Sequence, residues 1–194
     1  MFHNGAEHFN SIAAGPDAKS DQIIKIVNPS GGEMIVDVGS GGGYYSLIFA
    51  EMVGPRGKIY ALDVNTEFLD YINDQAALAN IHNVVTVPVQ GHTFPFSPQS
   101  VDKVFLRNVT HHMKQRKTFF KQVAAALKHD GTIYIIDYSP AGNRVGYGPP
   151  GHFVEPRELE EELDEAGLLR KATHEFIQGQ LFYEYGRDQN YTSF

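Results

Sequence analysis

The stretch MIVDVGSGGGYYSLIFA, residues 34–50, decides the fold of this chain. It begins with a nearly all-apolar run, which is typical of a strand buried on both faces of a parallel sheet. A glycine-rich turn follows, and then a segment with the composition of a helix. Glycine is needed where φ is positive or where a ligand approaches the backbone closely. The stretch therefore predicts a strand, a turn and a helix whose N-terminus holds a nucleotide.

The spacing of the glycines excludes two common kinds of nucleotide site. An acid and three glycines form the pattern D-x-G-x-G-x-G, at Asp37, Gly39, Gly41 and Gly43. The dinucleotide motif G-x-G-x-x-G would need glycine at Tyr44 or at Ser46, depending on where it starts. No Gly-Lys-Ser/Thr sequence closes the turn, so a phosphate-binding P-loop is also excluded.

Two acids flank this turn along the chain. Asp63 ends the next apolar strand, where a carboxylate can accept hydrogen bonds from both hydroxyls of a ribose. The alternative is that Asp63 caps the following turn beside Asn65. Asp37 precedes the glycines, where it can accept backbone N–H bonds and keep the turn rigid.

The rest of the chain alternates strands and helices and ends in a hairpin. Residues 1–19 show no clear period, and residues 139–158 are rich in Pro and Gly and predict a lid-like loop. Asn65 is expected to cap a helix, and Pro88 indicates an edge position or the end of a strand. The predicted strands are 33–39, 58–64, 83–90, 101–109, 132–139, 170–178 and 180–188, and the predicted helices are 20–27, 44–53, 66–80, 114–128 and 156–168. This order indicates an α/β fold with a closing antiparallel hairpin.

Length and composition narrow the function. The 194 residues suit one domain, 1–194, with residues 1–30 as an N-terminal cap segment. A net charge of −7 disfavours nucleic acid as a partner, and the lack of cysteine excludes disulfides and thiolate ligands. No signal-peptide pattern or membrane-spanning apolar run occurs in the sequence, so a cytoplasmic location is expected.

The glycine pattern, Asp63, the closing hairpin and one further line of sequence together resemble a known family. The glycine pattern and the line FPFSPQSVDKVFLRNVTHHM, residues 94–113, resemble the class I S-adenosylmethionine-dependent methyltransferases. The likeness is greatest to the group that includes the ubiquinone/menaquinone-biosynthesis methyltransferases, and it covers about residues 23–185. It implies a Rossmann-like sheet of seven strands in the order 3-2-1-4-5-7-6, with strand 7 antiparallel and helices on both faces.

The resemblance also implies the cofactor, S-adenosyl-L-methionine, with S-adenosyl-L-homocysteine as product. Asp63 would bind the ribose hydroxyls, Val64 would pack on the adenine and Asn108 would face the cofactor. His92 stands where the family often has an acid that binds the adenine amino group, so His92, Thr93 or backbone groups would make that contact. The turn residues expected against the methionine portion and the ribose, or at the pocket mouth, are Gly39, Ser40, Gly41, Gly43 and Tyr44.

The histidines give no assigned catalytic residue. His111 and His112 are adjacent, so on a helical turn they should point about 100° apart and not chelate one ion. No metal is therefore expected. A structural role for this pair is ordinary in the family, and a general base is the alternative. His152, in the predicted lid, either faces the acceptor or is solvated.

The sequence therefore predicts methyl transfer to a small, partly apolar molecule. One alternative is a methyltransferase that acts on protein or RNA, and another is a cofactor-binding protein without catalysis. A basic group on one predicted helix supports the macromolecular acceptor or is simply a solvated face, and it consists of Lys114, Arg116, Lys117 and Lys121. The acceptor atom and the oligomeric state stay open.

Overall fold

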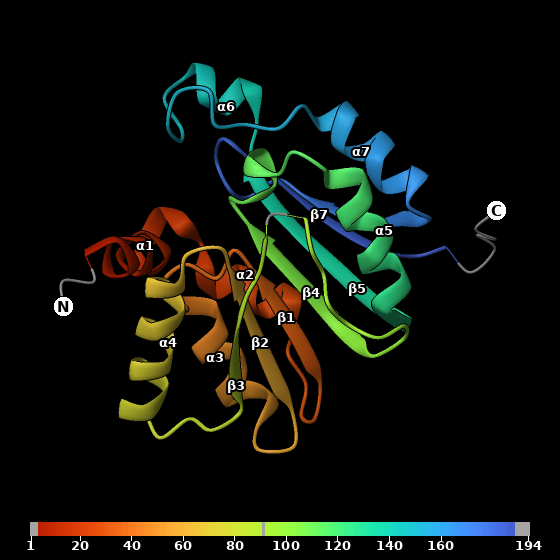
Figure 1. Cartoon of the computed structure of the whole chain (residues 1–194). Coiled ribbons are helices and arrows are strands. Elements are labelled where there is room, and N and C mark those ends of the chain that lie inside the picture. Colours follow the sequence, from red (N-terminus) through yellow and green to blue (C-terminus); the bar gives the residue numbers. More distant parts are fainter. Residues whose placement is uncertain (1–3, 91, 189–194) are drawn as a thin grey trace. The chain divides into compact units, whose positions relative to one another are not determined.

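A computed structural model describes residues 4–90 and 92–188 of the chain. Its seven strands form a sheet in the order β3-β2-β1-β4-β5-β7-β6, and β7 is antiparallel to both of its neighbours. The order and the antiparallel strand confirm the predicted Rossmann-like class. The chain divides into two compact units, Met1–Gln90 and Gly91–Phe194, drawn from red to yellow-green and from green to blue (Figure 1).

The N-terminal unit consists of three parallel strands and their connecting helices. The strands are β1 Met34–Val38, β2 Lys58–Asp63 and β3 Val84–Pro88. The helical elements are α1 Asn4–Ala14, η1 Pro16–Ala18, α2 Ser20–Val27, α3 Tyr44–Val53 and α4 Thr66–Leu78. Helices α3 and α4 pack on the strands. Fully buried Ile35 of β1, Ile59 of β2 and Ile72 of α4 contribute to the core between them.

Two local predictions hold in this unit. The side chain of Asn65 accepts a hydrogen bond from the backbone N–H of Glu67 at 3.0 Å, so it caps α4 as expected. Pro88 is the last residue of β3, which lies at the edge of the sheet. Proline has no N–H to donate to a ladder, which explains both placements.

Helix α1 is the main departure from the sequence analysis, which expected no element in residues 1–19. Among residues 5–14 of this helix, Ala6 is the one fully buried residue, whereas Phe9 and Ile12 are 49% and 47% exposed. The sequence therefore lacks the apolar stripe that marks a packed helix. The helix is held instead by contacts with α3 and α4, including an edge-to-face contact of Phe9 with Phe68.

The C-terminal unit contains the other four strands, with β4 parallel to β5 and β7 antiparallel between β5 and β6. This arrangement confirms the predicted hairpin. The strands are β4 Val101–Arg107, β5 Leu127–Tyr138, β6 Leu168–His174 and β7 Gln180–Arg187. The helical elements are η2 Thr110–His112, α5 Arg116–Ala126, α6 Pro140–Arg144 and α7 Pro156–Glu165.

The predicted ends of two helices in this unit were wrong, and a short helix lies within residues 139–158, where a lid-like loop was expected. Helix α5 stops at Ala126, because the fully buried Leu127 already pairs with Val101, so Asp130 and Gly131 lie within β5 and not in a turn before it. The short helix α6 forms in the predicted lid, where the Ser139 hydroxyl accepts from the N–H of Gly142. Helix α7 ends at Glu165, since Gly167 takes a positive φ of 78°.

Within residues 4–90 and 92–188, none of the helices combines the length and the apolar character that crossing a bilayer requires.

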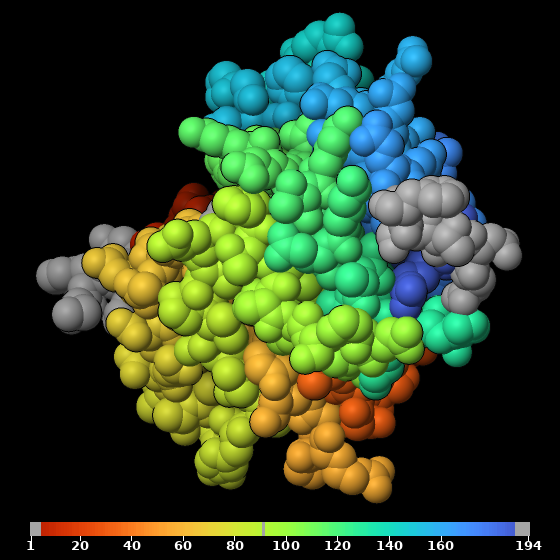
Figure 2. Space-filling model, turned by 45° about the vertical axis from the view of Figure 1, so that its right-hand side comes forward, coloured from red at the N-terminus to blue at the C-terminus, as the bar shows by residue number. Residues whose placement is uncertain are grey.

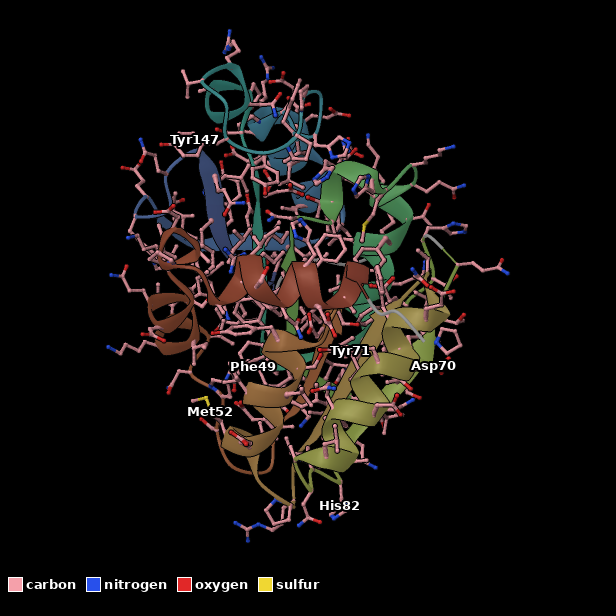
Figure 3. All side chains as sticks on the ribbon, turned by 90° about the vertical axis from the view of Figure 1, so that its left-hand side faces the viewer. Phe49, Met52, Asp70, Tyr71, His82 and Tyr147 are labelled. Atoms are coloured by element: carbon pink, nitrogen blue, oxygen red, sulfur yellow. The ribbon has the colours of Figure 1, made fainter. Side chains whose placement is uncertain are left out.

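Helix α3 gives a matched pair for testing its packing. Phe49 is fully buried, whereas Met52, one turn on, is 41% exposed (Figure 3). We expect Phe49→Ala to lower the free energy of unfolding by about 3–5 kcal/mol, because it removes a buried ring and leaves a cavity. Met52→Ala should change it by about 0.5 kcal/mol or less. Urea unfolding followed by circular dichroism measures both, and similar losses for the two variants would contradict this packing.

Candidate functional site

The glycine-rich turn, residues 39–43, joins β1 to α3 and is tied to the end of β2. Gly39, Gly41 and Gly43 have φ of 69°, 52° and 79°, a region that side chains other than glycine rarely adopt. The N–H groups of Gly39 and Ser40 both donate to the carbonyl of Leu62, at 2.8 and 3.0 Å. The turn therefore has one fixed conformation, set by the neighbouring strand.

Asp63, the last residue of β2, takes part in the same attachment. Its Oδ2 accepts from the N–H of Gly41 and its Oδ1 from the N–H of Asn65, both at 2.9 Å. The alternative role considered from the sequence, capping of the next turn, is thus realised. An ionised carboxylate has about four acceptor positions, so about two are left for donors of a ligand. Asp63 can hold the turn and bind ribose hydroxyls at the same time.

Asp37 lies behind the turn and is buried. Its Oδ2 accepts from the Ser46 hydroxyl at 2.6 Å, and the Ser46 backbone N–H also donates to this carboxyl. Burial raises the pKa of Asp37 to about 7; the Ser46 bonds oppose the rise, and the charge of Asp63 adds to it. Since Ser46 is on the first turn of α3, Asp37 fixes the helix to β1 and supports the site from behind.

Ser40 carries an unusual hydroxyl. Among the residues that the structure describes, its Oγ is the buried side-chain polar atom with no hydrogen-bond partner. Such atoms are rare in folded proteins and call for an explanation. A polar group of a bound molecule in the glycine-rich turn would provide the missing partner.

Helix α1 lies directly on the turn through Asn10. The Asn10 amide donates to the carbonyl of Gly42 at 2.8 Å, and its Oδ1 accepts from the N–H of Tyr44 at 3.2 Å. Tyr44 begins α3, so Asn10 supplies a cap that the turn itself lacks. A Cβ on Gly42 would come within 2.2 Å of the Ala6 carbonyl, so only glycine permits this approach.

Asn10 is a site residue that the sequence analysis missed, because residues 1–19 gave no helical period. The one signal available was Gly42, the middle one of three consecutive glycines, where the lack of a side chain lets another segment approach the backbone closely. Of the other predicted residues here, Tyr44 is half-buried in an edge-to-face contact with Tyr45, and Val64 is 68% exposed.

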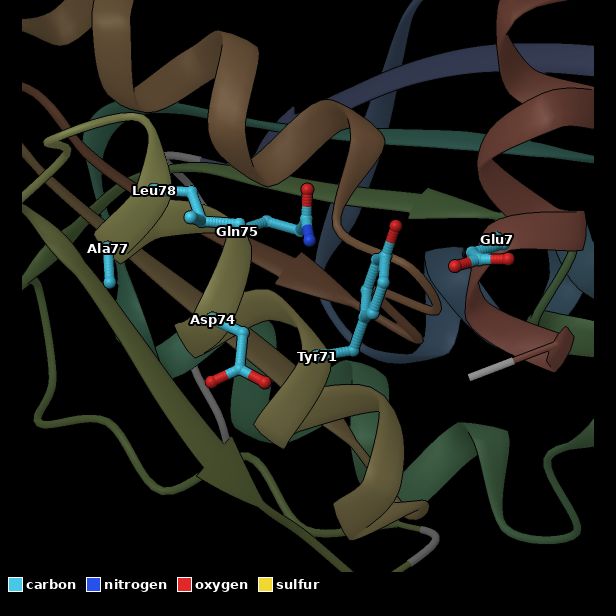
Figure 4. A pocket seen from close by; sticks show the side chains of 6 residues that line it. All are labelled: Glu7, Tyr71, Asp74, Gln75, Ala77 and Leu78. Carbon is cyan, nitrogen blue, oxygen red and sulfur yellow. The ribbon is translucent and has the colours of Figure 1, made fainter. Parts of the chain in front are cut away.

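A surface pocket of about 530 Å³ also belongs to the N-terminal unit (Figure 4). It is lined by Glu7 from α1 and by residues of α4, namely Tyr71, Asp74, Gln75, Ala77 and Leu78. Two carboxylates make it acidic, and its lining is separate from the turn and from Asp63. The chemistry of the turn therefore identifies the candidate site better than this hollow does.

In the C-terminal unit, Asn108 follows β4 with a φ of 53°. Its backbone N–H donates to Ile136 at 2.8 Å, its Oδ1 accepts from Gln180 at 2.6 Å, and its amide donates to the Tyr138 hydroxyl at 3.3 Å. Asparagine tolerates this left-handed conformation better than most residues. β5 and β7 thus hold both the backbone and the side chain of Asn108.

His92 and Thr93, the proposed adenine contacts, are both exposed in this unit. Gln122 of α5 fixes the backbone around them, since its Nε2 donates to the His92 carbonyl at 3.0 Å and its Oε1 accepts from the N–H of Phe94 at 3.1 Å. Their side chains project from an anchored loop.

The carboxylate of Asp137 organises the turn after β4. It is fully buried and accepts from the Thr110 hydroxyl, from the backbone N–H of His111 at 3.1 Å and from that of Tyr138 at 2.8 Å. Nδ1 of His111 lies 2.6 Å from its Oδ1. This contact assigns the imidazole proton to Nδ1, so Nε2 of His111 keeps a lone pair for a proton or a metal ion.

His112 and His152 lie beside His111, and the expectation that the adjacent pair diverges was wrong. The His111 and His112 ring centroids are 4.1 Å apart, and that of His152 is 5.1 and 5.0 Å from them. The short 3₁₀ helix and the loop before α7 bring the rings together. Partial burial lowers the pKa of His112, and the charges of His111 and His152 lower it further.

Two basic residues of α5, Arg116 and Lys117, are paired within the same unit. Nε of Arg116 lies 2.6 Å from Glu162 and Nζ of Lys117 lies 2.9 Å from Glu165, both on α7. Figure 2 shows the side chains of the two helices, green and blue, against each other. These pairs favour a helix–helix contact over a surface for nucleic acid.

Comparisons with known proteins agree with this geometry. The model of a methyltransferase domain family matches residues 36–135, just over half of the chain. A ubiquinone/menaquinone biosynthesis C-methyltransferase from Ectopseudomonas mendocina (strain ymp) is 27% identical over an alignment of 155 residues that covers 71% of this chain. The chain spans 59% of that relative, less than two thirds of its length.

Two solved structures share the fold. A SAM dependent methyltransferase from Aquifex aeolicus superposes with a TM-score of 0.76 at 23% identity, over 85% of this chain and 87% of that one. A putative type 11 methyltransferase from Sulfolobus solfataricus has a TM-score of 0.72 at 20% identity, over 91% and 95% of the two chains.

The raised pKa of Asp37 predicts how stability depends on pH. Between about pH 4 and pH 7 folded Asp37 keeps a proton that the unfolded chain has released, so its contribution is greatest at low pH and is lost as pH rises. In Asp37→Asn this loss is absent. From about pH 5 to pH 7 the stability of the wild type should therefore fall relative to the variant, by up to about 1.4 kcal/mol per pH unit.

Urea unfolding at several values from about pH 5 to pH 8 measures this difference. Asp70→Asn, at an exposed position on α4 (Figure 3), is the matched control and should keep the pH profile of the wild type. Parallel profiles for the wild type and Asp37→Asn would show that Asp37 is not buried as a neutral acid.

Proposed function

The chain belongs to the family of methyltransferase domains, and we propose that it transfers the methyl group of S-adenosylmethionine to a small-molecule acceptor. The observation that carries the proposal is the glycine-rich turn bonded to Asp63, whose carboxylate retains acceptor positions for ribose hydroxyls. The unpartnered Ser40 hydroxyl fits the same cofactor, because it offers one more polar contact in the turn.

The cofactor contacts in this proposal are those of the N-terminal unit. Asp63 binds the ribose, the turn with Gly39, Ser40, Gly41 and Gly43 receives the methionine portion and the ribose, and Tyr44 lies at the mouth. The 68% exposure of Val64 leaves an apolar side chain available to the adenine ring. For Asn108, and for His92 or Thr93 at the adenine edge, a role in cofactor binding stays a prediction from the family resemblance. Asp37 supports the turn from behind.

When bound, the cofactor supplies a sulfonium-activated methyl group, ready for in-line displacement. The work left to the protein is alignment of the acceptor and exclusion of water. A general base is required only for an acceptor that holds its proton at neutral pH. In that case His111 is the proposed base, since Asp137 fixes its Nδ1 and leaves Nε2 free to take the proton.

Two observations favour a small acceptor. Arg116 and Lys117, from the basic group that would support a macromolecular substrate, are paired with acids of α7. The relative from Ectopseudomonas mendocina is named for C-methylation in ubiquinone and menaquinone biosynthesis, which places phenols and quinols first among the acceptors to be tested.

Cofactor binding tests the first half of the proposal. Isothermal titration calorimetry should detect S-adenosylhomocysteine and give little heat with NAD. Asp63→Ala should weaken binding by about 1–3 kcal/mol, because the ribose hydroxyls lose their acceptor. Asp70→Ala, an exposed acid in the same unit, should leave the affinity unchanged. Binding of NAD in place of S-adenosylhomocysteine would reject the site.

Methyl transfer tests the second half. With methyl-labelled S-adenosylmethionine, a panel of quinols, phenols, amines and lipids should yield at least one labelled product, and Asp63→Ala should reduce the yield. Label that enters only protein or RNA would favour the macromolecular alternative. Binding of the cofactor without any transfer, across the panel and a cell extract, would favour a non-catalytic binding protein.

A further inference from the structure

Three histidines of the C-terminal unit form a cluster whose geometry the proposed function does not use in full. His111 and His112 come from η2, and His152 comes from the loop between α6 and α7. Each imidazole offers one ligand nitrogen, and the three nitrogens lie within 4.8 Å of one another. We propose that His111, His112 and His152 bind a divalent metal ion of the zinc class.

The donor set suits such an ion. Imidazole nitrogen is a preferred ligand of Zn²⁺, Cu²⁺ and Ni²⁺, whereas Mg²⁺ and Ca²⁺ prefer oxygen. Zn–N bonds of about 2.0–2.1 Å in a tetrahedral site put two ligand nitrogens about 3.3 Å apart. Closing the cluster around the ion therefore draws the nitrogens nearer by up to about 1.5 Å, a movement within reach of side-chain rotation.

Asp137 provides the outer partner that a metal-binding histidine requires. A ligating imidazole usually donates its other N–H to a carboxylate, which fixes the ring and makes the ligating nitrogen more basic. Oδ1 of Asp137 lies 2.6 Å from Nδ1 of His111, and the side chains are 0% and 4% exposed. His111 is thus held ready, with Nε2 as the ligand atom.

The exposure of His112 and the partial exposure of His152 let an ion reach the site, and a set of three ligands leaves one coordination position open. His112 is exposed and His152 is half-buried, so an ion can enter from solvent without unfolding the unit. Three protein ligands leave the fourth tetrahedral position for water or for an oxygen of another molecule, as in catalytic zinc sites. The ion would also link η2 to the loop that carries His152.

Metal and proton compete for the same lone pair on His111. A bound ion therefore excludes His111 as the general base while it is present. The site itself rests on the C-terminal unit alone and does not depend on cofactor binding or on methyl transfer.

Titration of the untagged 194-residue chain with Zn²⁺, and with Co²⁺ as a spectroscopic probe, tests the site. We expect one ion per chain, and a visible Co²⁺ spectrum typical of four coordination. His152→Ala and His112→Ala should each weaken binding by more than the about 10–100-fold that loss of an outer partner costs. His129→Ala, an exposed histidine next to an acid, is the matched control and should bind as the wild type does.

Three results would overturn the proposal. These are no binding of Zn²⁺ by the wild type, retention of binding by both ligand variants, and an equal loss in His129→Ala. Circular dichroism checks that the variants are folded. Binding of S-adenosylhomocysteine, measured in parallel, separates the two proposals. A histidine variant that loses the metal and still binds this product has lost the histidine cluster alone and keeps the cofactor site.

Discussion

The structure depends on carboxylates that are buried at the ends of strands and must be satisfied there. Burying a carboxylate is costly unless it is hydrogen-bonded or protonated. Asp63 meets this requirement with the N–H groups of Gly41 and Asn65, and Asp37 meets it with Ser46 and a raised pKa. Asp137 does so with four donors from the turn after β4 and from its own strand. Each acid thereby fixes the loop from which chemistry can be done.

The same requirement explains why the turn is rich in glycine. Its backbone has to bend back toward β2 so that Leu62 and Asp63 can accept its N–H groups, and positive φ makes this bend possible. Helix α1 then packs on the turn so closely that Gly42 has no room for a Cβ, and Asn10 supplies the missing cap of α3. Rigidity on these sides leaves Ser40 and the remaining acceptor positions of Asp63 for a ligand.

In the C-terminal unit, a buried carboxylate fixes an imidazole as the other two acids fix backbone groups and a hydroxyl. Asp137 determines which nitrogen of His111 carries the proton, and therefore which nitrogen is available for chemistry. One nitrogen each from His112 and His152 joins this nitrogen of His111, so that three candidate ligand atoms lie together. One arrangement thus supports both a proton acceptor and a metal ligand, and occupancy by an ion decides between them.

The sequence by itself determined the elements whose causes are local. The glycine spacing, the Asn65 cap, Pro88 at the end of β3 and the closing hairpin each follow from a few neighbouring residues, and the structure has all of them. The tertiary structure decided what depends on distant partners. Leu127 belongs to β5 and not to α5 because it pairs with Val101. Helix α1 is held by contacts with α3 and α4. The loop before α7 brings His152 to His111. Such contacts leave no period in the sequence, because packing between distant segments creates them.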